Sequence, residues 1–162
     1  MAKLTHVEGD VIAGAMKAEG GIILPHIVNN IGLWGKGFVV ALSDMWPIIS
    51  FKYKLLVGAT SNGEDLLGHN QTIMVRRGFQ VINMFAQRGV RGRGNPNPIS
   101  YGRLQKCLTG VSSTAFYHAG SSVHMPKIGS GLAGGDWEMI EKMVFETIVR
   151  NGTDVVVYTL PK

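Results

Sequence analysis

Short apolar runs rich in β-branched residues alternate along this chain with segments whose apolar residues recur at helical spacing. Apolar runs of this length are typical of buried strands, and spacings of three and four residues are typical of helices with one buried face. Chains that alternate the two kinds of segment pack helices against the faces of a sheet. The alternation therefore predicts an α/β fold with three layers, α/β/α, around a central sheet.

The individual elements follow from the same pattern. We expect strands over residues 3–7, 21–29, 71–76, 79–86, 122–126 and 154–160, and helices over residues 11–17, 38–45, 48–56, 100–118 and 136–151, with Ser100 as a helix cap. Arg77-Gly78 separates two strands by a turn of hairpin length, so these two strands should be antiparallel. Because the other strands are linked through helices, the predicted sheet is mixed.

The length and composition fit one compact domain, which we expect to span residues 1–162. Apolar residues make up 45% of the chain and charged residues only 17%, a balance that excludes a largely disordered protein. The formal net charge of +5 favours anionic partners but does not distinguish a nucleotide from a nucleic acid.

The single cysteine, Cys107, cannot form a disulfide within the chain, which favours a reducing compartment. Residues 1–10 are too polar for a secretory signal, and no apolar run reaches the roughly 20 residues of a membrane span. We therefore expect a cytoplasmic protein without a membrane partner, and a monomer. We expect Cys107 to be a buried structural thiol, and the scattered histidines predict neither a metal site nor a cofactor.

The first segment with chemical potential is residues 26–38, in which a buried strand runs into a loop with three glycines and then into a helix. Backbone N–H groups of such a loop and the positive end of the helix dipole form an anion site. Lys36 adds a positive charge. A tight strand-to-helix turn without a ligand is the alternative interpretation.

The second segment, residues 125–137, repeats this order of strand, glycine loop and helix. Two such loops at one edge of a sheet can clamp a diphosphate from both sides. Ser130 either donates to a phosphate or caps a turn. Asp136 opens the last helix, where it either caps the helix or acts on a ligand.

A third segment, Gly9-Asp10-Val11, follows the first expected strand. The Asp10 carboxylate can accept a hydrogen bond from an exocyclic amine while a neighbouring N–H donates to a ring nitrogen, a pattern that suits adenine. An aspartate in a turn is also ordinary structure.

These three segments resemble the motifs of one family, the macrodomains, over essentially the whole chain. Residues 8–10 (EGD) resemble its adenine-binding Gly-Asp, residues 28–37 (VNNIGLWGKG) its first loop, and residues 126–137 (PKIGSGLAGGDW) its diphosphate loop. The spacing of His26 and Asn29, with a hydrophobic residue before Gly-Lys-Gly, resembles one branch. That branch contains terminal ADP-ribose glycohydrolases, DNA de-ADP-ribosylating antitoxins and ADP-ribose-1''-phosphate phosphatases.

The resemblance implies that the protein binds ADP-ribose or a derivative, with ADP-ribosylated protein or nucleic acid as further partners. It implies a hydrolase whose polar candidates near the distal ribose are Asn29, His26 and Asp136. The implied ligand-binding residues are Asp10, Val11, Asn30, Gly32, Trp34, Gly35, Lys36, Gly37, Phe38, Ile128, Gly129, Ser130, Gly131, Leu132, Ala133 and Gly134.

The sequence departs from the branch at two places. The lysine that some members use as a nucleophile is replaced by Ala86 or Gln87, and the aspartate of the second loop is replaced by Ala133. Three functions therefore stay open: a hydrolase acting on the distal ribose, a non-catalytic reader of ADP-ribose, and a nucleic-acid-linked role. The nucleic-acid-linked role would use the basic flap, residues 87–98, which contains Arg88, Arg91 and Arg93. A buried core role for His26 also stays open.

Overall fold

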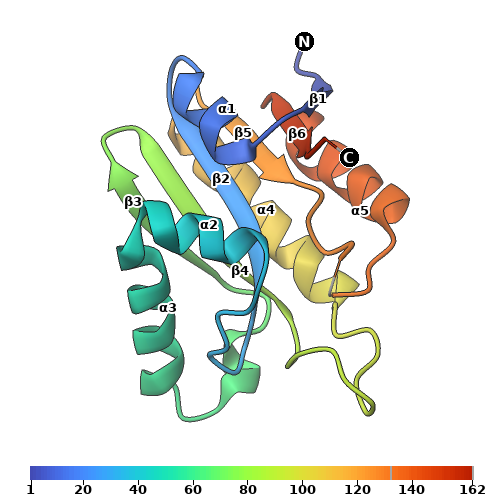
Figure 1. Ribbon diagram of the computed structural model, residues 1–162. Helices are drawn as coiled ribbons and strands as arrows, with labels where there is room; N and C mark the ends of the chain where they lie inside the picture. The colour runs from blue at the N-terminus through green and yellow to red at the C-terminus, as the bar shows by residue number, and fades with distance from the viewer. Residues whose placement is uncertain (132, 162) are drawn as a thin grey trace.

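The computed structural model describes residues 1–131 and 133–161 and contains one sheet of six strands in the order β1-β6-β5-β2-β4-β3 (Figure 1). The strands are β1 (Leu4–Glu8), β2 (Ile22–Asn29), β3 (Asn70–Arg76), β4 (Phe79–Gln87), β5 (Ser122–Pro126) and β6 (Val155–Thr159). Only β3, at one edge, is antiparallel to its neighbour, and the hairpin it forms with β4 is the predicted one. The expected mixed sheet is thus confirmed.

Five α-helices accompany the sheet: α1 (Val11–Lys17), α2 (Phe38–Met45), α3 (Pro47–Ala59), α4 (Tyr101–Tyr117) and α5 (Trp137–Val144). The bounds of α1 and α2 agree with the expected ones, and Ser100 caps α4 by accepting a hydrogen bond from the N–H of Arg103. One expectation was wrong. The last helix is not regular to residue 151, because a π-helical turn, Phe145–Val149, follows α5, and the Arg150 N–H bonds to the Phe145 carbonyl five residues back.

A second departure lies between α3 and β3, where the expected loop contains a 3₁₀ turn, Gly63–Leu66. The Asn62 side chain accepts a hydrogen bond from the N–H of Glu64 and begins this turn. The turn supports the site, because Glu64 pairs with Arg88 and the Gly63 carbonyl accepts a hydrogen bond from Asn30 at the start of the first glycine loop.

Helices cover both faces of the sheet, and residues at alternate strand positions pack against the helices of opposite faces. On one face, α4 and α5 pack over Ile23 and its neighbours; on the other, α1, α2 and α3 pack over Leu24 and its neighbours. This alternation follows from the two-residue period of a strand. The three-layer α/β/α fold is confirmed. Cys107 lies in the core on the first of these faces, where burial raises the pKa of its thiol to about 12 and keeps it unreactive, as expected.

The carboxyl ends of β1, β6, β5, β2 and β4 lie at one edge of the sheet because these strands are parallel. From β2 the chain continues toward α2 and the β3–β4 hairpin, whereas from β5 it continues toward α5 and β6 (Figure 1). Neighbouring parallel strands whose connections leave in opposite directions open a crevice between them, where α/β proteins bind their ligands. The two glycine loops follow these two strands.

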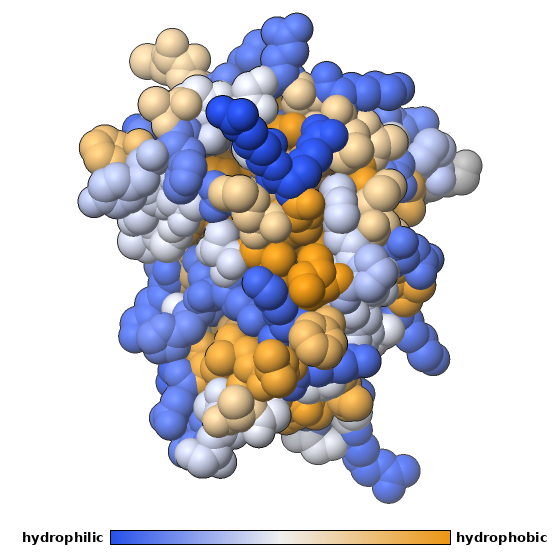
Figure 2. Space-filling model, turned by 90° about the vertical axis from the view of Figure 1, so that its left-hand side faces the viewer, coloured by the Kyte–Doolittle hydropathy of each residue, from blue (hydrophilic) through white to orange (hydrophobic). Residues whose placement is uncertain are grey.

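Figure 2 shows the side of the molecule that carries α3 and the edge strand β3, with apolar side chains among charged ones. Ile48, Phe51 and Leu55, spaced along α3, are 42%, 62% and 61% exposed. No helix among residues 1–131 and 133–161 combines the length and apolar character that crossing a lipid bilayer requires.

Candidate functional site

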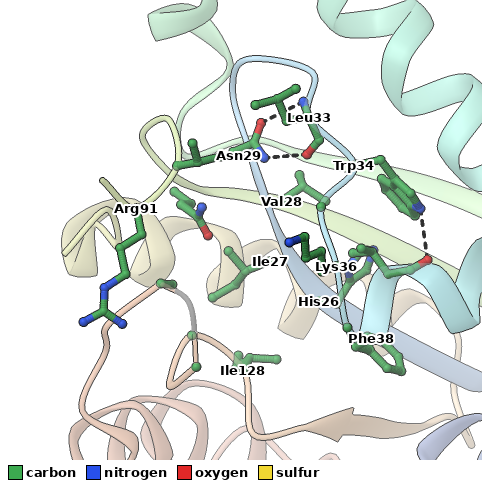
Figure 3. A pocket seen from close by; sticks show the side chains of 18 of the residues that line it. His26, Ile27, Val28, Asn29, Leu33, Trp34, Lys36, Phe38, Arg91 and Ile128 are labelled. Atoms are coloured by element: carbon green, nitrogen blue, oxygen red, sulfur yellow. Dashed lines mark hydrogen bonds between the residues drawn. The ribbon is translucent and has the colours of Figure 1, made fainter. Parts of the chain in front are cut away.

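The first loop, residues 30–37, is shaped by the side chain of Asn29 at the end of β2. Its Oδ1 accepts hydrogen bonds from the N–H groups of Ile31 (3.1 Å) and Leu33 (3.3 Å), and its Nδ2 donates to the Leu33 carbonyl at 2.6 Å (Figure 3). Tyr53 of α3 donates from its hydroxyl to the same Oδ1 at 2.7 Å. Asn29 therefore holds the start of the loop, and one amide hydrogen remains for any contact with a ligand.

The end of the first loop needs glycine. Gly37, which precedes α2, has a φ of 78°, a conformation that side-chain-bearing residues rarely adopt. A Cβ on Gly35 would meet no atom within 4 Å, so glycine at this position is not needed to avoid a clash within the protein. Its effect is to leave the backbone of the loop uncovered.

The described residues of the second loop, 129–131 and 133–135, contact the protein closely at two of their glycines. A Cβ on Gly129 would lie 2.5 Å from Cδ1 of Ile99, and the Gly135 N–H donates to the Gly129 carbonyl at 2.7 Å. Gly131 differs, because a Cβ there would meet nothing within 4 Å. The tight glycines fix the shape of the loop, and Gly131 presents open backbone.

Both loops face one cleft with a cavity volume of about 950 Å³, which is large enough for a dinucleotide-sized ligand. The two loops thus meet across one cleft, as their positions after parallel strands predict. Of the predicted site residues, the cleft is lined by His26, Asn29, Trp34, Gly35, Lys36, Gly37, Phe38, Ile128, Gly129, Gly131 and Ala133 (Figure 3).

The charge of the cleft is one-sided. Its lining contains four cations, Lys36, Lys54, Arg91 and Lys127, and no carboxylate among the residues that the structure describes. Such a site attracts anions, and the attraction is strongest where water is excluded.

Several predicted residues lie outside this lining. Asp10 caps α1 through a 2.9 Å hydrogen bond from the Ala13 N–H, and Asp136 caps α5 through a 3.0 Å bond from the Glu138 N–H. Asp136 therefore takes the capping role that the sequence offered as its alternative, and Asp10, for which the sequence offered an ordinary turn position, also caps a helix. The Ser130 hydroxyl donates to the Lys127 carbonyl, closing a turn. The other predicted residues outside the lining are Val11, Asn30, Gly32 and Gly134, and Leu132 falls outside the described residues.

His26 occupies the middle of β2 and is only 2% exposed. It lies edge-on to the rings of Trp34 and Phe38, and its Nε2 is 2.5 Å from Oδ1 of Asn83 on β4. Asn83 Nδ2 donates to Oε1 of Gln71 on β3, forming a row of polar side chains across three strands. The structure thus places His26 in a core position, the alternative that the sequence left open.

The polar row fixes the tautomer of His26. The Gln71 Nε2 donates to the Lys52 carbonyl, so the Gln71 Oε1 accepts the hydrogen bond from Asn83 Nδ2. Because the Asn83 nitrogen is the donor to Gln71, the Asn83 oxygen faces His26 and accepts a hydrogen bond from the Nε2–H of that ring. The His26 Nδ1 carries no proton and has no partner among the described residues. Burial lowers the pKa of His26 to about 4, so the ring is neutral at pH 7.

Sequence reasoning missed Lys54 and Val90 in the lining of the cleft. Lys54 lies on α3, 18 residues beyond Lys36, and no local pattern distinguishes it from a solvent-exposed helix lysine. Of the three flap arginines, Arg91 alone lines the cleft; the side chain of Arg88 instead forms a two-point ion pair with Glu64, at 2.9 and 2.8 Å.

Comparison with known proteins agrees with this architecture. A macrodomain protein from Streptomyces coelicolor superposes with a TM-score of 0.80 at 32% identity, covering 97% of this chain and 99% of that one. The human ADP-ribose glycohydrolase OARD1 is 24% identical over 159 residues, 98% of this chain and 93% of its own. The structure of Thermosipho africanus DarTG in complex with ADP-ribose shares the fold, with a TM-score of 0.73 at 17% identity over 99% of this chain and 42% of that one.

No protein-family model matches the chain. The likeness to the Streptomyces protein nevertheless extends over nearly all of both chains, at an identity high enough to define a family. The chain belongs to the macrodomain family.

Proposed function

We propose that the cleft binds ADP-ribose and that the protein hydrolyses an ADP-ribose derivative at the distal ribose. The observation that carries the proposal is the pair of glycine loops on neighbouring strands β2 and β5, facing one cleft lined by four cations and, within the described chain, no carboxylate. Backbone N–H groups on both sides of a diphosphate neutralise it without long side chains. The DarTG complex with ADP-ribose and the activity in the name of OARD1 support the same ligand.

The order of strands gives the ligand a direction. Asp10 follows β1 and the flap follows β4, so the two lie toward opposite ends of the row β1-β6-β5-β2-β4, with the glycine loops between them. Adenine near Asp10 and a diphosphate between the loops would put the distal ribose beside Asn29 and Gln87. Asp10 serves adenine in this proposal while it also caps α1.

The polar groups left for catalysis are few. Gln87 donates from Nε2 to the Gly89 carbonyl, which leaves its Oε1 to orient a water molecule. The remaining amide hydrogen of Asn29 would hold the ribose or the same water. The water oxygen would bond to the reacting atom at the distal ribose as the bond from that atom to the leaving group breaks, and one proton of the water would pass to the leaving group. The loops would hold the diphosphate in position during this step. His26 is a poor general acid or base in this scheme because its pKa lies near 4.

The proposal is tested by isothermal calorimetry with ADP-ribose and AMP, followed by product analysis. We expect micromolar or tighter binding of ADP-ribose and at least tenfold weaker binding of AMP, because AMP fills only one end of the cleft. Incubation with ADP-ribose-1''-phosphate, ADP-ribosylated protein and ADP-ribosylated DNA should release product from at least one of them. Equal affinities for AMP and ADP-ribose would contradict the binding proposal, and the absence of product would leave a non-catalytic reader.

Asn29→Ala should lower turnover at least tenfold, about 1.4 kcal/mol, and lower the affinity for ADP-ribose by less, if the amide acts on the reacting centre. Tyr53→Phe is the matched control, because it removes the 2.7 Å hydrogen bond to Asn29 Oδ1 and leaves the amide in place. It should therefore change turnover far less. Steady-state kinetics and calorimetry decide: a parallel fall of turnover and affinity in Asn29→Ala would assign Asn29 to the loop alone.

A further inference from the structure

The flap, residues 87–98, is folded in place rather than loose. The Gly89 N–H of the flap donates to Oδ1 of Asn30 at 2.9 Å. Within the flap, the side chain of Asn95 donates to the carbonyls of Arg88 (2.7 Å) and Val90 (3.1 Å). Gly92 and Asn95 also exchange two backbone hydrogen bonds. These contacts hold the segment around Arg91 from both sides.

The flap also connects the two glycine loops. Asn30, at the start of the first loop, bonds to Gly89 and, through its Nδ2, to the Gly63 carbonyl at 3.1 Å. At the other end, the N–H of Ile99 just after the flap donates to the carbonyl of Ala133 in the second loop at 3.2 Å. The flap therefore lies at the β4 end of the cleft, whereas Asp10 lies toward the opposite end of the row of strands.

Arg88 and Arg91, the first two arginines of the flap, have different surroundings. The charge of Arg88 is balanced by Glu64, whereas Arg91 lines the cleft and has no hydrogen bond or ion pair among the described residues. The flap itself contains no acidic residue. Figure 3 shows the Arg91 side chain extending from the flap alongside the cleft, on the side of Asn29 away from Trp34.

We infer that Arg91 forms a second anion subsite, which binds a phosphate group attached to the ligand beyond the distal ribose. A guanidinium presents paired N–H donors that match two phosphate oxygens, and a positive charge without a protein partner is available for that pairing. The inference rests on the proposed function, because the diphosphate clamp sets the place of the distal ribose. The phosphate is either a terminal monoester or a diester within a nucleic acid, and both present the same oxygens to Arg91.

The test compares ADP-ribose with two analogues that carry a phosphonate on the distal ribose, whose C–P bond the protein cannot hydrolyse. The free acid represents a terminal phosphate and its methyl ester represents a diester. Calorimetry at low salt is run on the wild type, on Arg91→Gln and on Arg93→Gln. Arg93 is the matched control, because it is an exposed arginine of the same flap that does not line the cleft.

We expect the wild type to prefer at least one phosphonate over ADP-ribose by fivefold or more, and Arg91→Gln to abolish this preference. The measure is the ratio of the two affinities in each protein, because Arg91 also lines the cleft that holds ADP-ribose. Arg93→Gln should keep the preference, and added salt should weaken it. Preference for the free acid alone identifies a terminal phosphate, and equal preference for both identifies the diester as an acceptable partner. The subsite is overturned if ADP-ribose binds but neither phosphonate is preferred, or if Arg91→Gln retains the preference. Failure of ADP-ribose itself to bind overturns the proposed function, and the subsite with it.

Discussion

Replacing Gly131 by glutamate should lower the affinity for ADP-ribose at least 100-fold and leave the fold intact. Gly131 lines the cleft, and a Cβ there meets no atom within 4 Å, so the side chain has room to project toward the diphosphate. Its backbone is not in the left-handed region, so a substituted residue is not strained. Two like charges about 5 Å apart near a protein surface repel by about 3 kcal/mol, which corresponds to a factor of more than 100 in affinity.

Two variants separate charge from size and from position. Gly131→Ala adds a methyl group without charge and should retain affinity within a few fold. Gly102→Glu adds the same charge at another open, exposed glycine that does not line the cleft, and it should bind as the wild type does. Calorimetry and thermal melts of all three variants are the measurement. Wild-type affinity in Gly131→Glu, with an unchanged melting temperature, would show that the second loop does not hold the diphosphate.

The second large effect concerns acid stability. We expect the free energy of unfolding to fall by about 3 kcal/mol between pH 7 and pH 4 because of His26 alone. Each unit by which its folded-state pKa lies below the unfolded value contributes about 1.36 kcal/mol. The folded-state pKa of His26, about 4, lies below the unfolded value of 6.5, so protons bind preferentially to the unfolded chain. The contribution of neutral His26 to the free energy of unfolding is therefore fully present above pH 6.5 and is lost as the pH falls toward 4.

Urea unfolding at a series of pH values, for the wild type and His26→Gln, tests this expectation. Glutamine can still donate to Asn83 but does not titrate, so the variant should lose less stability on acidification even if its stability at pH 7 is lower. Burial also lowers the pKa of His124, and its contribution remains in both proteins. Identical slopes of unfolding free energy against pH for the two proteins would contradict the assignment to His26.

The order of the elements could be predicted from the sequence because it depends on local patterns. The predicted first and last residues of α1, α2 and β5 are the observed ones, and Ser100 was correctly predicted as the cap of a helix. The two glycine loops could be placed at one edge because both follow strands that the pattern makes parallel. The single irregularity of the last helix, Phe145–Val149, could not be foreseen, since one extra residue in a turn leaves the apolar spacing almost unchanged.

The site itself was predicted only in part. The glycines and Lys36 carry a local signal, because backbone conformation and helix starts have sequence signatures. Lys54 carries none, because it reaches the cleft through the packing of α3. The sequence singled out the flap arginines as a group, and only the contacts of the folded flap show that Arg91 is the one that lines the cleft. The capping role of Asp136 was visible as an alternative, and its hydrogen bond from the Glu138 N–H shows that it caps α5. The cap that Asp10 provides for α1 was not predicted from the sequence.

The sequence alone determined the succession of strands and helices, the three-layer class and the two glycine-rich loops, because these depend on neighbours within a few residues of one another. Tertiary structure alone decided the chemistry of His26 and Asn29. The hydrogen bond of His26 joins residues 57 positions apart, and that of Tyr53 to Asn29 joins residues 24 apart. Such pairs exist only after strand register and helix packing have brought distant segments together, and no local preference of the chain encodes them.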